Sequence, residues 1–197
     1  MTEFTPKIFE EHTSYVRKPQ RKDSVFGFFE LNVVGMCYDP DTDGWCGYNC
    51  FAWALFEMNQ VFADGMGYRI RKMMGKTMQE HRALLIEFLT SSEYNDTLET
   101  LSMAPDESNA WWLTFPSCLW VALIAFGCPF LFAHVSYEKP LLFNMPDNPL
   151  VDTDIPFFLL DDNEHFRAYK IKHYTAGEEN QSIEQPEFDR LFMCIYE

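Results

Sequence analysis

The chain has 197 residues, of which 47% are hydrophobic and 17% aromatic, so it can bury the core of one folded domain and does not belong to the disordered class. Its formal net charge of −15 comes from 30 acidic and 15 basic residues, which argues against nucleic acid as a partner because phosphate binding requires Lys and Arg. A partner protein with a basic surface suits this charge better.

The six cysteines are expected to be reduced thiols in a cytoplasmic protein, since residues 1–7 contain no apolar signal region. Zinc is the other common use of cysteine clusters. Cys46 and Cys50 are close in sequence, but Cys118 and Cys128 do not form a second close pair and no Cys-x-x-Cys occurs. We therefore expect neither a metal nor another cofactor.

An apolar run at residues 119–135 approaches the roughly 20 residues that span a bilayer. Gly127 and Pro129 interrupt it, and Gly followed by Pro is typical of the end of a helix. The run is therefore expected to form a buried helix and then a strand, with no membrane partner.

In chain order, residues 1–25 are polar and are expected to form an arm or a first helix. Residues 26–37 are rich in Phe and Val, which favours a strand that ends at an Asp-Pro turn. A helix with a buried face is expected to begin at Cys46. A second helix is expected to begin at Thr77, which has the spacing of a capping box with Glu80.

The second half of the chain is expected to hold helices first and strands afterwards. The expected elements are a short helix and surface loop in 91–109, a helix over 118–126 capped by Ser117, strands over 130–135, 155–160 and 165–171, and a final strand over 188–196. This order predicts an α+β fold, with one domain from residue 26 to residue 197.

The stretch Asp43-Gly44-Trp45-Cys46-Gly47 leads from a turn directly into a helix. A thiol at a helix start is near unpaired backbone N–H groups and the positive end of the helix dipole, which favour the thiolate. The same N–H groups can stabilise an oxyanion. Cys46 is therefore a candidate nucleophile, and a buried cysteine without a chemical role is the structural alternative.

A nucleophilic thiol requires a base, usually histidine. His12 and His81 are expected to be solvated, and His134 to be a core residue of a strand. His165 is favoured over His173, because it opens a strand directly after a polar turn.

A third group must orient the imidazole, and a carboxylate or an amide can do so. The candidates close to either half of the site are Asp39, Asp41, Asp43, Asp162 and Asn163.

Four features together resemble the ovarian-tumour (OTU) family of cysteine proteases: Asp43-Gly44-Trp45-Cys46 before a helix, Trp111-Trp112 before a buried helix, Pro129 before a strand, and a strand and turn that end in His165-Phe166. The form Asp-Gly-x-Cys-Gly-aromatic is similar to the OTU-like papain-type proteases of arteriviruses. The resemblance covers about residues 26–172. It implies an OTU-like α+β fold, with a central and mostly antiparallel sheet packed between helices.

The resemblance also implies a deubiquitinase with ubiquitin or a ubiquitin-like protein as its partner. Cys46 would attack the carbonyl after the C-terminal Gly-Gly of ubiquitin, and His165 would act as the base. The oxyanion hole and the substrate channel would be formed around Gly44, Trp45, Gly47, Trp111 and Phe166.

Many family members carry Asn or Asp two residues after the histidine, where this chain has Arg167. We therefore expect Asp43 to be the third catalytic residue, with Asn163 and Asp39 as alternatives. Other functions that the sequence leaves open are a viral-type polyprotein protease, a papain-like protease that uses Cys50-Phe51-Ala52, and a non-catalytic ubiquitin-binding module.

Overall fold

The computed structural model describes residues 16–29, 33–55, 66–104, 112–145 and 153–174. The strand expected over 188–196 and the first 15 residues lie outside these ranges.

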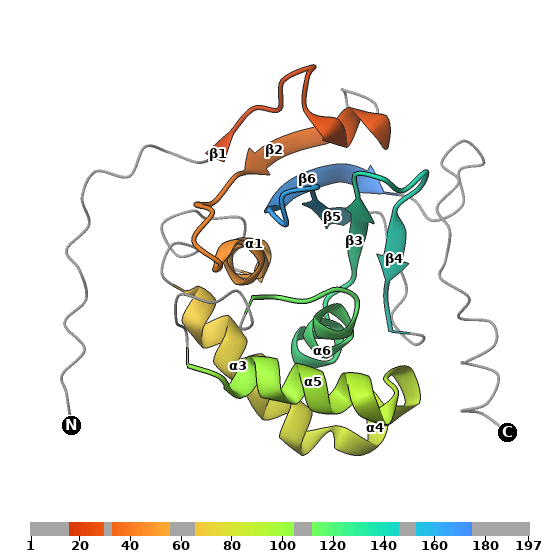
Figure 1. Cartoon of the computed structure of the whole chain (residues 1–197). Coiled ribbons are helices and arrows are strands. Elements are labelled where there is room, and N and C mark those ends of the chain that lie inside the picture. Colours follow the sequence, from red (N-terminus) through yellow and green to blue (C-terminus); the bar gives the residue numbers. More distant parts are fainter. Residues whose placement is uncertain (1–15, 30–32, 56–65, 105–111, 146–152, 175–197) are drawn as a thin grey trace, which may run out of the picture.

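Among the described residues, six strands form one sheet in the order β1-β2-β6-β5-β3-β4 (Figure 1). Their bounds are β1 Val16–Arg17, β2 Val34–Tyr38, β3 Phe130–His134, β4 Leu141–Phe143, β5 Thr153–Leu160 and β6 Phe166–Tyr174. Neighbouring strands run antiparallel, except that β3 and β5 are parallel. The expected α+β class is confirmed, and the sheet is mixed with mostly antiparallel pairs.

The α-helices of the described residues all lie on one side of this sheet (Figure 1). Their bounds are α1 Cys46–Leu55, α3 Gly67–Glu80, α4 Arg82–Phe88, α5 Ser91–Ser102 and α6 Ser117–Phe126. Helix α1 packs directly against β6, and α3 packs against α1. The helical layer therefore places the start of α1 beside the start of β6.

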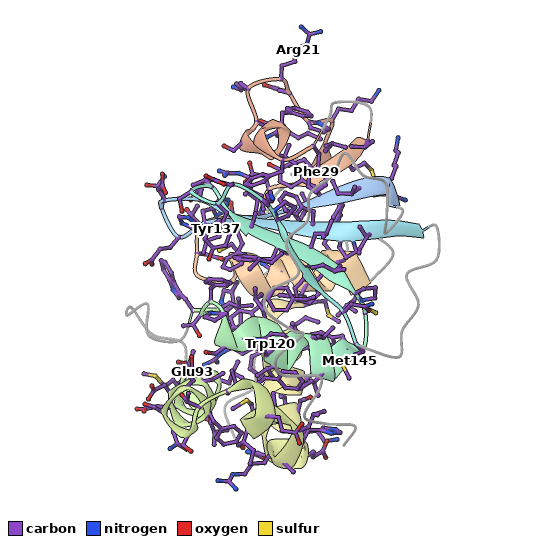
Figure 2. All side chains as sticks on the ribbon, turned by 90° about the vertical axis from the view of Figure 1, so that its right-hand side faces the viewer. Arg21, Phe29, Glu93, Trp120, Tyr137 and Met145 are labelled. Atoms are coloured by element: carbon purple, nitrogen blue, oxygen red, sulfur yellow. The ribbon has the colours of Figure 1, made fainter. Side chains whose placement is uncertain are left out.

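Among the described residues, the opposite face of the sheet is covered by residues 25–29 and by no α-helix. These residues include most of a short 3-10 helix, η1 (Ser24–Gly27), which follows the edge strand β1. Val25 is fully buried, and the Phe29 ring lies edge-on to Phe157 at 5.0 Å between centroids. Figure 2 shows Phe29 on one side of the sheet and Trp120 on the other. The part of the chain that the structure describes therefore has one layer of α-helices, and not the two that were expected around the sheet. From the expected N-terminal arm, β1 pairs with β2 and Val25 is buried.

Both faces of the central strands are buried, since side chains alternate between two apolar clusters. In β3, Phe130 and Phe132 belong to the helical side, while Leu131 belongs to the opposite side. The Phe51 ring of α1 lies 4.4 Å from the Phe158 ring and 5.3 Å from the Phe130 ring, between centroids. These aromatic contacts, each stabilising beyond simple area burial, fix α1 against the sheet.

Two sequence predictions in the first half of the chain are wrong. The described part of the apolar run expected as one strand over 26–37 forms the end of η1 and then β2, because Phe26, Phe28 and Phe29 pack against the face of the sheet instead of pairing as a strand. Thr77 lies inside α3 and donates its hydroxyl to the Met73 carbonyl oxygen at 3.0 Å. Because Thr77 lies within α3, it does not cap the N-terminus of a helix.

The apolar run at 119–135 does divide into α6 and β3, as expected. Gly127 ends α6 with a φ of 64°, a left-handed conformation that suits glycine. Ser117 is the first residue of α6 rather than its cap. Within the described ranges, no helix is both long and apolar enough to cross a membrane.

Candidate active site

The turn before α1 requires glycine at position 44. Gly44 has a φ of 82°, and a Cβ atom there would lie 2.2 Å from the Trp112 indole nitrogen. The Asp43 carboxylate accepts a hydrogen bond from the Trp45 backbone N–H at 3.0 Å, which closes the turn. The Trp112 indole thus packs against the loop that precedes Cys46.

Cys46 is the first residue of α1, at the positive end of the helix. The Asn49 N–H donates to the Trp45 carbonyl at 2.8 Å, so the N–H groups of Cys46 and Gly47 precede this first helical hydrogen bond. Such N–H groups are the usual donors to an oxyanion. Gly47 leaves room for Phe166, since a Cβ atom there would lie 3.2 Å from the Phe166 ring.

His165 is held by the turn between β5 and β6. One oxygen of the Asp161 carboxylate accepts hydrogen bonds from the backbone N–H groups of Asn163 at 2.9 Å and His165 at 3.1 Å. Glu164 adopts a left-handed φ of 58° so that the chain can reverse. The turn therefore sets the His165 ring at the start of β6, and His173 lies at the other end of that strand.

The two ring nitrogens of His165 have different surroundings. Nε2 lies 2.8 Å from Oδ1 of Asp39, which assigns it the proton that the carboxylate accepts. Nδ1 is buried and has no hydrogen-bond partner among the described residues. Because Nε2 is occupied by Asp39, Nδ1 is the nitrogen that remains for a reacting proton.

The Cys46 and His165 side chains lie in one region of the molecule, because Gly47, next to Cys46, packs against the Phe166 ring, next to His165. Burial opposes the charged His165 ring, but the hydrogen bond with Asp39 and the interaction with the Cys46 sulfur outweigh it and raise its pKa to about 9. His165 and Cys46 are both only 5% exposed. The structure therefore brings together the thiol and the imidazole that the sequence predicts as nucleophile and base. The distance between two such groups is often longer without substrate than with it.

Asp39 is fixed by Arg167 as well as by His165. The Arg167 Nε donates to Oδ1 of Asp39 at 3.0 Å, and its Nη1 donates to Oδ2 of Asp161 at 2.8 Å. Although burial alone would raise it, the pKa of Asp39 is lowered by the His165 hydrogen bond and the Arg167 charge. Arg167 thus links Asp39 to the turn that carries His165.

The histidine partner is Asp39, one of the alternatives, and not the expected Asp43. Asp43 accepts from the Trp45 N–H, and Asn163 is an exposed residue of the turn. The physical reason is strand register: Tyr38 pairs with Ala168 across β2 and β6, which carries Asp39 past the end of β2 toward His165 and Arg167. Sequence distance to Cys46 does not reveal this pairing.

Comparison with known proteins identifies no family for this chain. No protein-family model, no curated protein and no solved structure matches this chain. The geometry itself has a thiol at a helix start, an imidazole beside it and a carboxylate on the far ring nitrogen, which is the arrangement of a nucleophile, a base and an orienting group. In the part of the chain that the structure describes, no three His, Cys, Asp or Glu side chains could together hold a metal ion.

A cleft of about 660 Å³ opens beside Cys46. Its lining includes glycines, aromatic rings and acidic residues of the β5–β6 turn: Gly44, Cys46, Gly47, Trp112, Phe115, Phe166, Asp161, Asp162 and Glu164. Trp45, expected in the channel, is not among the described residues that line it and packs against Tyr48 and Tyr68. Trp111 lies outside the described residues, and Trp112 beside it lines the cleft.

Cys50 and His134, a second thiol and a second imidazole near the candidate site, have other hydrogen-bond partners. Cys50 is fully buried, its Sγ donates to the Phe166 carbonyl at 3.6 Å, and burial raises the pKa of this thiol well above its usual value. His134 lines the cleft, but its Nδ1 lies 2.6 Å from the Ser136 hydroxyl. Neither replaces Cys46 or His165.

Proposed function

We propose that this protein is a cysteine protease of the OTU type, which hydrolyses the bond after the C-terminal Gly-Gly of ubiquitin or a ubiquitin-like modifier. The observation that carries the proposal is the His165 ring, which binds Asp39 through Nε2 and leaves a buried Nδ1 for Cys46 at the start of α1. The sequence resemblance to the OTU family supports the substrate class.

The chemistry follows from these positions. The Cys46 thiol proton passes to Nδ1 of His165 before the sulfur attacks, so that the thiolate and the charged ring are the reactive form. The thiolate then attacks the scissile carbonyl carbon, and the N–H groups at the start of α1 stabilise the oxyanion. The imidazolium then protonates the leaving amine, and a thioester remains on Cys46. The neutral ring next takes a proton from water, whose oxygen attacks the thioester, and the proton returns to the departing sulfur.

Two features of the cleft support a substrate that has a C-terminal Gly-Gly sequence and a basic surface. Trp112 and Phe166 pack against glycine positions next to Cys46, which leaves little room for substrate side chains at the scissile bond. Asp162 and Glu164 line the cleft, are exposed and give its rim a negative charge. We expect the basic surface of ubiquitin to be attracted to this rim.

The test is reaction with a ubiquitin probe that carries a C-terminal electrophile, followed by mapping of the labelled residue. The label is expected on Cys46, and Cys46→Ala should abolish it. Cys50→Ala is the control: it should keep the label and lower the free energy of unfolding by about 1–2 kcal/mol through a small cavity and a lost hydrogen bond.

Fluorogenic ubiquitin separates the alternatives. Turnover that depends on Cys46 supports the proposal. Binding without turnover would instead indicate a ubiquitin-binding module, and cleavage of unrelated peptides but not of ubiquitin would indicate a papain-like or polyprotein protease. Labelling on Cys50 in the native protein would reject the proposed nucleophile.

A further inference from the structure

A second hollow lies away from the cleft, between α3 and α5, which are neighbours in Figure 1. It has a volume of about 570 Å³. We call it the α3–α5 groove, and the residues that matter to its chemistry are Arg69, Lys72, Met73, Gly75, Lys76 and Leu101. Met73 is 49% exposed there and adds apolar surface to the groove.

The fold does not require glycine at the centre of this groove. A Cβ atom on Gly75 would meet only Leu101, at 3.8 Å, which is an ordinary van der Waals distance. At Gly67, by contrast, a Cβ atom would lie 2.5 Å from the Asn49 side chain. Glycine inside a helix costs about 1 kcal/mol relative to alanine. Gly75 therefore lowers the stability of α3 without a packing reason, and its effect is to open the groove.

Three cations line the same groove. Arg69, Lys72 and Lys76 recur at the spacing of one helix face, and all three are exposed. Within the described ranges, Arg69 and Lys72 form no ion pair, and Lys76 has only an exposed pair with Glu80 at 3.5 Å, which is worth little in water. In a chain of net charge −15, this is a local positive field beside apolar atoms.

The groove is preformed, because α3 and α5 are tied together near both of its ends. The Arg71 Nη2 donates to the carbonyl oxygens of Thr100 and Met103, each at 2.6 Å. The Tyr94 hydroxyl donates to the Met78 carbonyl at 2.6 Å. A ligand would therefore bind without first paying to separate or order the helices.

We propose that the α3–α5 groove binds an acidic segment of a partner protein, with one apolar side chain seated over Gly75 between Met73 and Leu101. Carboxylates that flank this side chain would pair with Arg69, Lys72 and Lys76. A nucleic acid backbone would satisfy the cations but leave the apolar floor uncovered. The inference does not depend on the proposed hydrolysis.

The test uses the full chain and fluorescently labelled peptides of about 12 residues, a length that can follow a groove between two helices. The peptides carry Glu and Asp around one central residue, which is Ala, Leu, Met, Phe or Trp. A matched peptide has Ser at the centre, and an oligothymidylate of similar length represents nucleic acid. Fluorescence anisotropy should show the tightest binding for a large apolar centre.

Two variants in the groove and two control variants test whether the peptide binds in the α3–α5 groove. Lys72→Glu and Gly75→Leu should each weaken binding by at least about tenfold, equivalent to 1.4 kcal/mol. Lys172→Glu, an equal charge change at an exposed position of β6, should leave binding unchanged within about twofold. Gly75→Ala should raise the melting temperature, which verifies that glycine is not needed for folding.

Four results would overturn the proposal: no binding of any apolar-centred peptide, equal binding of the Ser-centred peptide, tighter binding of the oligothymidylate, or equal weakening by Lys172→Glu and Lys72→Glu. Because Leu is a good helix former, loss of binding in Gly75→Leu with an unchanged melting curve reports on the groove and not on unfolding.

Discussion

At the scale of single residues, the choice between Asp39 and Asp43 has a direct consequence for the proposed reaction. Asp39→Asn removes the charge that stabilises the His165 imidazolium and should lower kcat/KM by at least about 10²-fold. Asp43→Asn keeps an oxygen that can accept from the Trp45 N–H, so its effect should be less than about tenfold. Steady-state kinetics of both variants decide the assignment, and a larger loss in Asp43→Asn would reverse it.

The raised pKa of His165 predicts the alkaline limit of activity. The charged ring is present below its pKa of about 9 and is lost as the pH rises through that value, so kcat/KM should fall there. In Asp39→Asn the ring loses its main stabilising partner, and the limit should move down toward the ordinary histidine pKa of about 6.5. The pH profiles of kcat/KM for the unmodified protein and for Asp39→Asn test this shift. If the alkaline limit is the same in both, Asp39 does not determine the pKa of His165.

The residues of the candidate site were predictable where the signal was local. The helix start at Cys46 is predictable from consecutive residues, and so is the polar turn that places His165 before a strand. Asp39 was only an alternative, since its contact with His165 depends on the register of β2 against β6. No role is predicted for Arg167 from the sequence, whereas its guanidinium holds Asp39 in place.

At the scale of elements, capping shows how a local pattern succeeds or fails. Thr90 begins α5 with a complete capping box, in which its side chain accepts from the Glu93 N–H and Glu93 accepts from the Thr90 N–H. The same spacing at Thr77 and Glu80 lies inside α3, where the hydroxyl bonds to the preceding turn. The pattern identifies a cap only where the residue before it has left the helical conformation, as Leu89 does with a ψ of 136° at the end of α4. Residues 67–76 are already helical, so the same spacing at Thr77 marks no helix start.

Helix α5 should therefore depend on Thr90. Thr90→Ala removes the acceptor for the Glu93 N–H and should lower the free energy of unfolding by about 1 kcal/mol. Ser92→Ala is a suitable control, because its hydroxyl makes one exposed contact with Asp96 at 3.4 Å, and its effect should stay within about 0.5 kcal/mol. Urea denaturation measures both, and equal effects would mean that the box contributes nothing.

At the scale of the whole molecule, the order of helices and strands gave the α+β class, but not the arrangement of the layers. The sheet order brings β2, from the first third of the chain, between β1 and β6, and this pairing creates the site. The described cover on the second face includes Val25 and Phe29, which lie where the polar N-terminal residues meet the apolar run 26–37, and the apolar run alone does not distinguish η1 from a strand. Long-range pairing of this kind leaves no periodic signal in the sequence.

The net charge of −15 gives the last prediction, which concerns the whole surface. If the protein recognises ubiquitin, the complementary potentials act mainly on the association rate and are screened by salt, with a Debye length of about 10 Å at 0.1 M. The kcat/KM for a ubiquitin substrate should therefore fall as salt rises. A short peptide with only the C-terminal residues of ubiquitin meets a smaller part of this field and should respond less. The kcat/KM for the ubiquitin substrate divided by that for the peptide, measured from low to moderate salt, should decrease steadily as salt rises. A ratio independent of salt would mean that the acidic residues do not contribute to recognition, and Asp162 and Glu164 would then be solvated rim residues without a role in binding.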